Sequence, residues 1–373
     1  MDKLTNSNQL IEQSKFVDTG PKLTDAVSKM ASAKALSIDT EFMRERTYYP
    51  ELCLIQVADG DAYWCIDTVE IEDLSPFLAL CGDDSITKIL HSARQDLEIF
   101  YLLMESVPMP VFDTQLAASF TGRAEQISYA GLVEDILGVT LDKSQSRTNW
   151  AARPLRPEQI SYALNDVVYL ESLQQKLLDE LVTKGRDSWF AEDAKTLGEA
   201  SVYMVAPAEA WQKVKGAGSL TPEAFQRVVL LAGWRERVAQ DKNLPRSWVL
   251  KDGTLTALAE SPNVDLREHQ RKGVLTSKQL KRWGEELDQV LREPLPNIAL
   301  PAYYGNRGLD REQKELFKKI SELIKGVAAE LGISSSLLAN RKEMEKLARG
   351  ASESSIFLGW REEIVGKAVR ALT

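Results

Sequence analysis

The pattern of hydrophobic and polar positions changes character partway along the chain. In the first half, short runs rich in Ile, Val, Leu and aromatic residues predict β-strands, and helical patterns follow them. The strand-like runs are KALSIDTEF, LCLIQVAD, AYWCIDTV and ITKILHSA, and the helical segments begin near Arg94, Thr114, Ser128 and Pro157. This order predicts an α/β domain in which helices flank a mixed sheet.

From about Pro207 the strand runs stop and helical patterns take over, beginning with Thr221 as N-cap and Pro222 at the first helical position. Two segments, VAQDKNLPRSWVLKDGTLTALA and VAAELGISSSLLANRKEMEKLA, align without a gap and predict a duplicated helical module. The paired apolar positions are Leu244 with Ile333, Trp248 with Leu337, Val249 with Leu338, Leu255 with Met344, and Leu258 with Leu347.

The proline-containing segment REPLPNIALPAYY separates the two copies and reads as an extended linker. We therefore expect an α/β domain over residues 1–205 and a first helical domain over 206–292. A linker over 293–302 and a second helical domain over 303–373 complete the expected organisation.

Composition limits the class of protein. With 373 residues and 44% hydrophobic content, the chain can bury the cores of two or three domains. No apolar run approaches the ~20 residues that span a bilayer, and the N-terminal MDKLTNSNQLIEQ lacks the layout of a signal peptide. We expect a cytoplasmic protein without a membrane segment, and a monomer, because nothing in the chain demands a symmetric interface.

Cysteine content and charge exclude further classes. Cys53, Cys65 and Cys81 are odd in number and lack CxxC spacing, so we expect core thiols rather than disulfides or a zinc site. The net charge of -9 argues against general affinity for nucleic-acid backbones, which depends on clustered Lys and Arg. Any nucleic-acid site must be local.

Asp39 and Glu41 lie at the end of the run LSIDTEF, separated by one residue. In a strand, residues two apart point to the same side, so both carboxylates project together while Ile38, Thr40 and Phe42 take the other face. Two like charges this close repel each other, and a divalent cation with hard oxygen ligands is the usual agent that offsets the cost. On this pair alone, a strand end that faces solvent is the simpler explanation, so further acids are needed.

Two later acids stand near predicted helix starts. In HSARQDLEIFYLL, Ser92 and Gln95 have the spacing of a capping box, which predicts a helix with Asp96 in its first turn. Acids are common there because they suit the helix dipole, so Asp96 alone is weak evidence of a site. Asp113 in VFDTQLAASF is interpreted as the N-cap of the following helix, a structural role.

The segment RPEQISYALNDVVYLESLQQKLLDEL predicts a helix that Pro157 opens. Its apolar stripe runs through Ile160, Ala163, Leu164, Val167, Leu170 or Val168, Leu177 and Leu181. Tyr162, Asp166 and Tyr169 lie on another face, which an ordinary solvated surface would also explain. Yet NDVV is poor helix-forming material, and a Tyr four residues before an Asp aims a hydroxyl and a carboxylate at one point. A functional site would account for both features.

As a set, these residues resemble a known family. D-x-E on the first strand, an Asp that opens a later helix, and Y-x-x-x-D on the last helix resemble the tyrosine subclass of the DEDD superfamily of 3′→5′ exonucleases. The phrases DTEFMRERTYYPELCLIQVA, KILHSARQDLEIF and NWAARPLRPEQISYALNDVVYL are similar to bacterial ribonuclease D, and GWRERVAQDKNLPRSWVLKD is similar to the helicase-and-RNase-D C-terminal (HRDC) domain. The resemblance covers nearly all of the chain. It implies a ribonuclease H-like domain of the proofreading-exonuclease type, followed by two all-α HRDC-type domains.

The resemblance also implies roles for individual residues. Asp39, Glu41, Asp96 and Asp166 match the metal-binding acids, and Tyr162 matches the residue that orients the attacking water. Two divalent cations, Mg²⁺ or Mn²⁺, are therefore expected, held ~4 Å apart so that they stabilise the attacking and leaving oxygens. The implied reaction is hydrolysis of RNA from its 3′ end with release of nucleoside 5′-monophosphates, and the implied substrates are transfer RNA precursors.

Candidate RNA contacts are less sharply indicated. Lys143, in the polar and basic stretch LDKSQSRTNWAARPL, is a candidate for contacting the terminal phosphate, although a solvated loop fits equally well. Phe42 can border the terminal base or belong to the core, and Trp150 is expected to pack. Local basic runs in the helical half are candidates for phosphate contact or simply a solvated face, and they comprise Arg271, Lys272, Lys278, Lys281, Arg282, Arg341 and Lys342.

Two alternatives stay open at this point. Carboxylate and metal chemistry does not distinguish the two sugars, so a DNA-directed 3′→5′ exonuclease would carry the same acids. A non-catalytic RNA-binding adaptor would keep the fold but usually lacks one of the acids, and none is missing here.

Overall fold

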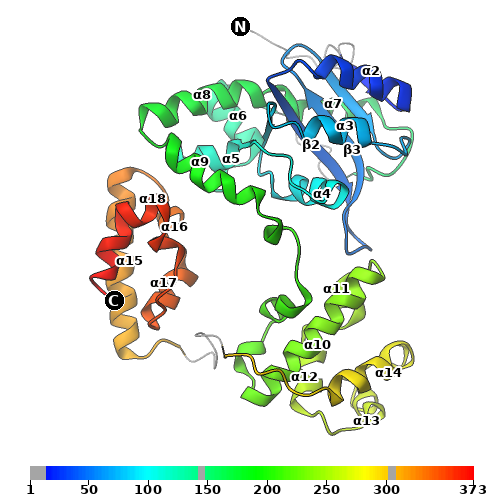
Figure 1. Ribbon diagram of the computed structural model, residues 1–373, viewed down its shortest axis with the longest axis vertical. Helices are drawn as coiled ribbons and strands as arrows, with labels where there is room; N and C mark the ends of the chain where they lie inside the picture. Colours follow the sequence, from blue (N-terminus) through cyan, green and yellow to red (C-terminus); the bar gives the residue numbers. More distant parts are fainter. Residues whose placement is uncertain (1–13, 142–147, 301–307) are drawn as a thin grey trace.

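The computed structural model describes residues 14–141, 148–300 and 308–373, which form an α/β domain and two helical modules (Figure 1). The α/β domain comprises β1 (Ser14–Val17), α2 (Gly20–Met30), β2 (Ala35–Met43), β3 (Glu51–Ala58), β4 (Tyr63–Asp67), α3 (Ser75–Cys81), β5 (Thr87–Leu90), α4 (Arg94–Met104), β6 (Val111–Asp113), α5 (Thr114–Thr121), α6 (Tyr129–Leu137), α7 (Pro157–Val168), α8 (Leu170–Thr183) and α9 (Asp187–Lys195).

The two helical modules follow in sequence. The first consists of α10 (Pro222–Asp241), α11 (Arg246–Val249), α12 (Asp252–Glu260), α13 (Leu266–Arg271) and α14 (Ser277–Arg292). The second consists of α15 (Arg311–Leu331), α16 (Ser335–Leu338), α17 (Arg341–Ala348), α18 (Gly359–Arg361), a π-helical turn (Glu362–Gly366) and α19 (Lys367–Arg370). Short 3₁₀ turns connect α9 to α10.

The six strands form one mixed sheet in the order β1-β4-β3-β2-β5-β6. The central β2 pairs antiparallel with β3 and parallel with β5, so it is covered on both edges. The predicted mixed sheet is confirmed, and the four strands read from the sequence are β2 to β5. The short edge strands β1 and β6 were not predicted, because three or four residues carry too little alternation to be read as a strand.

Helices cover both faces of the sheet, and the alternation of β2 decides which residue meets which layer. On one face, Leu36 and Ile38 pack with α2, α3 and α4. On the other face, Leu54 and Cys65 pack with α5, α7 and α8. The three cysteines are free and buried, as expected for core thiols. The sequence-predicted helix from Pro157 is two helices, because the chain bends at Tyr169 and turns that ring into the core.

The first helical module holds the tip of the β2–β3 hairpin. Tyr48, at this tip, is buried in the hydrophobic core of the module, and its hydroxyl donates to the Glu236 carboxylate. Arg246 lies over the Tyr48 ring at 4.8 Å and also pairs with Glu236. The side-chain oxygen of Asn243 accepts the backbone N–H of Tyr48 at 2.9 Å. The hairpin that carries the acidic end of β2 is therefore anchored in another part of the chain.

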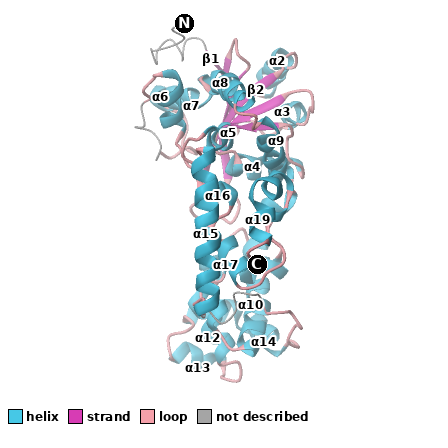
Figure 2. Ribbon diagram, turned by 90° about the vertical axis from the view of Figure 1, so that its left-hand side faces the viewer, coloured by secondary structure: helices cyan, strands magenta, loops and turns pink. Residues whose placement is uncertain are grey.

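The second helical module packs against α9 of the α/β domain. Trp360 is 4% exposed and stacks on Trp189, with ring centroids 4.7 Å apart and an interplanar angle of 11°. Arg361 donates two hydrogen bonds of 2.7 Å to the Asp193 carboxylate. Each module thus has its own contact with the α/β domain: the first with the β2–β3 hairpin and the second with α9. Figure 2 shows the long helix α15 running between the level of the α/β domain and that of the first module.

The two modules repeat the same opening helices. A long helix, a four-residue helix and a second helix occur as α10, α11 and α12 and again as α15, α16 and α17, at the positions paired in the sequence. This agreement supports the predicted duplication. One paired position differs, because Leu337 is 8% exposed whereas Trp248 is 55% exposed. In the part of the chain that is described, no helix has the length and apolar content needed to cross a bilayer.

The packing of Trp360 predicts a large effect on stability. We expect Trp360→Ala to lower the free energy of unfolding by about 3–5 kcal/mol, the usual range for truncating a buried Trp or Phe, as measured by urea denaturation. Trp248→Ala removes the same side chain from an exposed position and should stay within about 0.5 kcal/mol of the parent protein. Equal effects of the two substitutions would contradict the packing described for Trp360.

Candidate active site

Three carboxylates meet at the end of β2. Asp39 and Glu41 project from the face that α7 covers, and Asp166 of α7 faces them. One oxygen from each residue can be chosen so that all three lie within 4.8 Å of one another. A register shift between Glu41 and Phe42 ends the regular pairing with β3 directly after the second acid. The strand and the helix are distant in sequence, so only the packing of α7 on the sheet creates this cluster.

Asp96 approaches the cluster from the opposite face of the sheet. It lies in the first turn of α4, as predicted, and is 7% exposed. Thr40 points to that side of β2, and its hydroxyl donates to the Asp96 carboxylate. The charge of Asp96 acts on Asp39, which places the fourth acid near the other three. Thr40 therefore links β2, which carries Asp39 and Glu41, to α4, which carries Asp96.

Burial and mutual repulsion make these carboxyl groups reluctant to ionise. Burial, followed by the charges of the other acids, raises the pKa of Asp39 well above its ordinary value. The same causes raise the pKa of Glu41 to about 9 and that of Asp166 to about 7. Burial raises the pKa of Asp96 to about 6, against the opposing hydrogen bond from Thr40. Without a counter-charge, the cluster retains protons at neutral pH.

These residues fit a divalent cation. Carboxylate oxygens are the hard ligands that Mg²⁺ and Mn²⁺ take, and no sulfur or imidazole ligand is in the cluster. Burial is the larger cause of the raised pKa values, and a positive ion would offset the repulsion that adds to it at Asp39, Glu41 and Asp166. The three acids that meet can therefore hold a metal ion at the end of β2, with ligands from β2 and α7, whereas Asp96 of α4 lies outside this group of three.

Tyr162 lies one helical turn before Asp166 on α7, so both side chains are on the same side of that helix. Its ring is partly buried, with its centroid 6.2 Å from that of Trp150. Trp150 is 3% exposed and belongs to the core, which confirms the prediction that it packs. The ring of Tyr162 thus lies next to the buried ring of Trp150.

The predicted capping box at Ser92 is wrong. The helix begins at Arg94, its N-cap is Ala93, and Ser92 has a left-handed backbone with φ of 57°. The carboxylate of Asp113 instead accepts the backbone N–H groups of Ser92 and Ala93 at 3.0 and 2.9 Å. It also accepts from Gln115, as the predicted N-cap of α5. Asp113 therefore ties together the starts of two helices, one of which carries Asp96, and the tertiary contact replaces the local cap.

Tyr129 is a residue near the site that the sequence pattern did not indicate. Its hydroxyl accepts the backbone N–H of Tyr169 at 3.2 Å, at the bend between α7 and α8. Burial, then the charge of Asp166, raises the pKa of Tyr129 well above its ordinary value. A lone Tyr at the start of α6 carries no motif, so only the fold places it beside the acids.

The candidate RNA contacts have different outcomes. Lys143 lies outside the described residues. Phe42 is partly buried and belongs to none of the hydrophobic clusters among the described residues, so contact with a base stays a prediction. Arg153, from the same basic stretch as Lys143, is committed to structure by two hydrogen bonds of 2.6 Å to Asp67.

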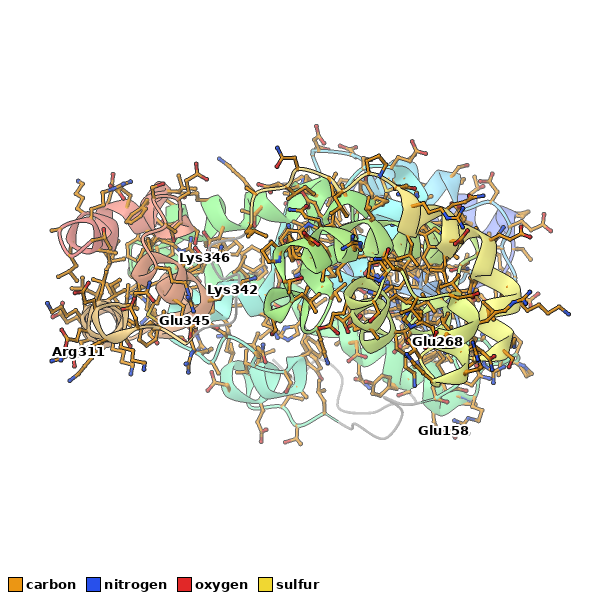
Figure 3. The ribbon with its side chains drawn as sticks, turned by 90° about the horizontal axis from the view of Figure 1, so that it is seen from below. Glu158, Glu268, Arg311, Lys342, Glu345 and Lys346 are labelled. Carbon is orange, nitrogen blue, oxygen red and sulfur yellow. The ribbon has the colours of Figure 1, made fainter. Side chains whose placement is uncertain are left out.

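The basic residues predicted in the helical modules lie on helix surfaces, and some of them form ion pairs with acids of the same helix. Lys272 pairs with Glu268 and Arg341 with Glu345, as is usual for solvated helix faces. Figure 3 shows Lys342 on the side of the second module that faces the rest of the molecule, whereas Arg311 lies toward its outer side. A role for these residues in phosphate contact stays a prediction.

Comparison with known proteins places this geometry in context. A family model described as 3′-5′ exonuclease matches residues 15–182, and an HRDC domain model matches residues 224–291. Ribonuclease D of Sphingobium indicum is 37% identical over 360 residues, covering 93% of this chain and 92% of the relative. Ribonuclease D of Escherichia coli K12 is 34% identical, with 96% of this chain and 97% of the relative covered.

Solved structures agree with these matches. The crystal structure of Escherichia coli RNase D, described as an exoribonuclease involved in structured RNA processing, superposes with a TM-score of 0.87 at 33% identity. The superposition covers 96% of this chain and 98% of that chain. A protein from Bifidobacterium adolescentis shares the fold at 21% identity, with a TM-score of 0.68 over 96% of each chain.

The raised pKa values predict a pH-dependent stabilisation by metal. In the unfolded chain these carboxyls ionise near pH ~4, whereas the folded protein keeps protons on them up to pH 6–9. As pH rises through this window the unfolded state loses protons first, so the metal-free fold loses stability. We expect Mg²⁺ to raise the melting temperature more at pH 8 than at pH 6, measured by thermal unfolding with and without chelator. An equal shift at both values would contradict a metal site built from these acids.

The bond between Thr40 and Asp96 predicts a second effect on metal binding. Thr40→Val keeps the shape of the side chain but removes the hydroxyl that holds one Asp96 oxygen. We expect the dissociation constant for Mn²⁺ to rise about 10-fold or more, as for other groups that orient metal ligands, measured by titration with electron paramagnetic resonance. Thr40→Ser retains the hydroxyl and should bind Mn²⁺ like the parent protein. Matching losses in both variants would show that packing, not the hydrogen bond, matters.

Proposed function

Given that the chain belongs to the ribonuclease D family of 3′→5′ exoribonucleases, we propose that it removes nucleotides through two divalent cations held by Asp39, Glu41, Asp96 and Asp166. The observation that carries the proposal is the meeting of Asp39, Glu41 and Asp166 within 4.8 Å. Asp96, buried beside Thr40, completes a four-acid site whose charge about matches that of two divalent ions.

Each residue has a task that its position supports. When bound by these residues, divalent cations would supply charge stabilisation for the attacking water and for the departing 3′ oxygen. Asp39, Glu41 and Asp166 hold their oxygens toward a common point, and Thr40 keeps Asp96 directed at the same end of the sheet. Because all four residues stand on regular elements of the core, the ligands are held before RNA arrives.

Tyr162 holds the attacking water by a hydrogen bond. A phenol with an ordinary pKa near ~10 is a poor proton acceptor at neutral pH, so positioning suits it better than base catalysis. The sister subclass carries a His at this place, and the two histidines of this chain, His91 and His269, are not there. The His91 ring is instead engaged with Thr114 and with the Ile127 carbonyl. Attack on the terminal phosphodiester would release a nucleoside 5′-monophosphate.

The substrate proposal is RNA with a free 3′ end, in particular transfer RNA precursors. The description of the Escherichia coli relative, which names structured RNA processing, supports a substrate of this kind. The monomeric state, the cytoplasmic location and the domain boundaries at residues 205, 292 and 302 belong to the same proposal.

Stepwise shortening of RNA tests the function. RNA labelled at its 5′ end should lose one nucleotide at a time with Mg²⁺ or Mn²⁺ and stay intact with chelator. Asp166→Asn removes one ligand charge and should lower the rate by at least about 10³-fold, while Tyr162→Phe should cost about 10²-fold, in the range of a positioned acid–base group. Gel electrophoresis of the products measures both rates.

The controls separate the alternatives. RNA with a blocked 3′ end should resist the enzyme, and circular dichroism should show that Asp166→Asn is folded. Shortening of matched DNA at the same rate as RNA would favour a DNA-directed exonuclease. Binding of RNA without any metal-dependent shortening would favour an adaptor and would refute the catalytic proposal.

A further inference from the structure

A basic hollow lies where the β2–β3 hairpin meets the first helical module. Its volume is about 540 Å³. We call it the seam pocket, and its lining residues are Arg44, Glu45, Thr47, Tyr48, Lys213, Arg235, Pro245, Arg246, Ser247, Lys251 and Asp252. Five of these side chains are cations and two are carboxylates, in a protein whose net charge is -9. The lining of the seam pocket therefore carries more positive than negative side chains, although the protein as a whole is negatively charged.

The cations of the seam pocket exceed their partners. Arg44 pairs with Glu98, Arg235 with Asp252 and Arg246 with Glu236, so these three charges are balanced. Lys213 and Lys251 have no ion-pair partner among the described residues. Both lysines are exposed, so their ammonium groups are accessible to an anion in the pocket.

Arg235 provides an independent sign of a ligand. Its side chain lines the pocket although the residue is 3% exposed. One terminal nitrogen donates to the Leu250 carbonyl and to the Asp252 carboxylate, at 2.9 and 2.8 Å. The Nε atom has no hydrogen-bond partner in the described structure, and neither has the buried hydroxyl of Thr47 in the same lining. Buried polar groups are rarely left unsatisfied, so these two atoms leave unused hydrogen-bonding capacity at the wall of the seam pocket.

An exposed aromatic ring stands beside the seam pocket. Trp248 follows Ser247 of the lining on α11 and is 55% exposed, although the duplicated position Leu337 is buried. It lines a second, smaller hollow of about 250 Å³ together with Lys278 and Arg282. A tryptophan flanked by cations is the combination that binds single-stranded nucleic acid, because bases stack on the ring while phosphates meet the charges.

We propose that the seam pocket binds backbone phosphates of the RNA substrate upstream of its 3′ end, and that Trp248 stacks on an adjacent base. This inference rests on the exoribonuclease function and adds a binding site to it. The pocket is near the acids, because Arg44 follows Glu41 by three residues on the same chain segment, or roughly 10 Å along an extended backbone. RNA held here extends from the active site across to the first helical module.

Salt dependence of binding tests the proposal. The full-length chain is titrated into single-stranded RNA in the presence of chelator, so that binding is measured without cleavage. Loss of one phosphate contact flattens the plot of log Kd against log salt concentration by about 0.7 for single strands. We expect Lys213→Ala with Lys251→Ala to flatten the slope by about 1.4 on this basis. Trp248→Ala should weaken binding about tenfold at every salt concentration without changing the slope.

Matched variants make the result decisive. Lys22→Ala with Lys29→Ala removes the same charge from α2, where both lysines pair on the surface, and should leave the slope unchanged. An unchanged slope for the seam variant would overturn the proposal. So would a slope that Lys278→Ala with Lys281→Ala flattens and that the seam variant leaves unchanged, because the phosphates would then lie on α14. One further outcome would refute the proposal. Inorganic phosphate would stabilise the parent protein but not the seam variant (Lys213→Ala with Lys251→Ala), while the two proteins have equal salt slopes for RNA. The pocket would then be a site for a free anion.

The outcome is separable from that of the catalytic proposal. Failure of the parent protein to shorten RNA with metal would refute the nuclease chemistry, whereas the binding slopes are measured without metal. The phosphodiester of a dinucleotide is the one that is cleaved, so this substrate has no upstream phosphodiester for the seam pocket to bind. Its rate of cleavage should therefore be the same in the seam variant and in the parent protein, and a large loss would assign the two lysines to the active site instead.

Discussion

The mutual repulsion of four crowded carboxyl groups, of which Asp96 is buried and the other three are half-buried, is the constraint on which the structure depends. Asp39, Glu41 and Asp166 lie within 4.8 Å, and burial with like charge raises their pKa values far above those of free acids. Such a cluster persists only if the surrounding fold holds it together. The central position of β2 in the sheet and the packing of α7 across it provide that support. A divalent cation held by these carboxylates would offset the same repulsion.

The supports of the site come from both faces of the sheet. On the α4 side, Thr40 holds Asp96, and Asp113 holds the turn from which α4 begins. On the α7 side, Tyr162 packs near the buried ring of Trp150, while Tyr129 meets the bend after α7. The four acids themselves stand on β2, α4 and α7. The ligands are thus carried by rigid elements, which suits a metal site whose geometry must be set before the substrate arrives.

The hairpin that bears two of the acids is also the hairpin that anchors the first helical module. Tyr48 is buried in the module and bonded to Glu236, only seven residues after Glu41. The second module reaches the same domain through Trp360 and Arg361. Because both contacts are buried and partly charged, the helical modules are structural neighbours of the nuclease domain rather than tethered appendages. The seam pocket is a consequence of this arrangement, since neither the hairpin nor the module forms it alone.

Local patterns in the sequence determined the α/β and all-α halves, strands β2 to β5, the starts of α5 and α7, and the duplication of the opening helices, because periodicity and capping act between near neighbours. The candidate acids were also found, although their roles came from resemblance to a family. Tertiary structure alone decided that Asp113 holds the turn before α4 in place of a local cap at Ser92. It also decided that Tyr129 and Thr40 stand beside the acids, and that Arg235 lines a pocket with residues of the hairpin. These features join segments far apart in the chain, and no local pattern records which distant groups will meet.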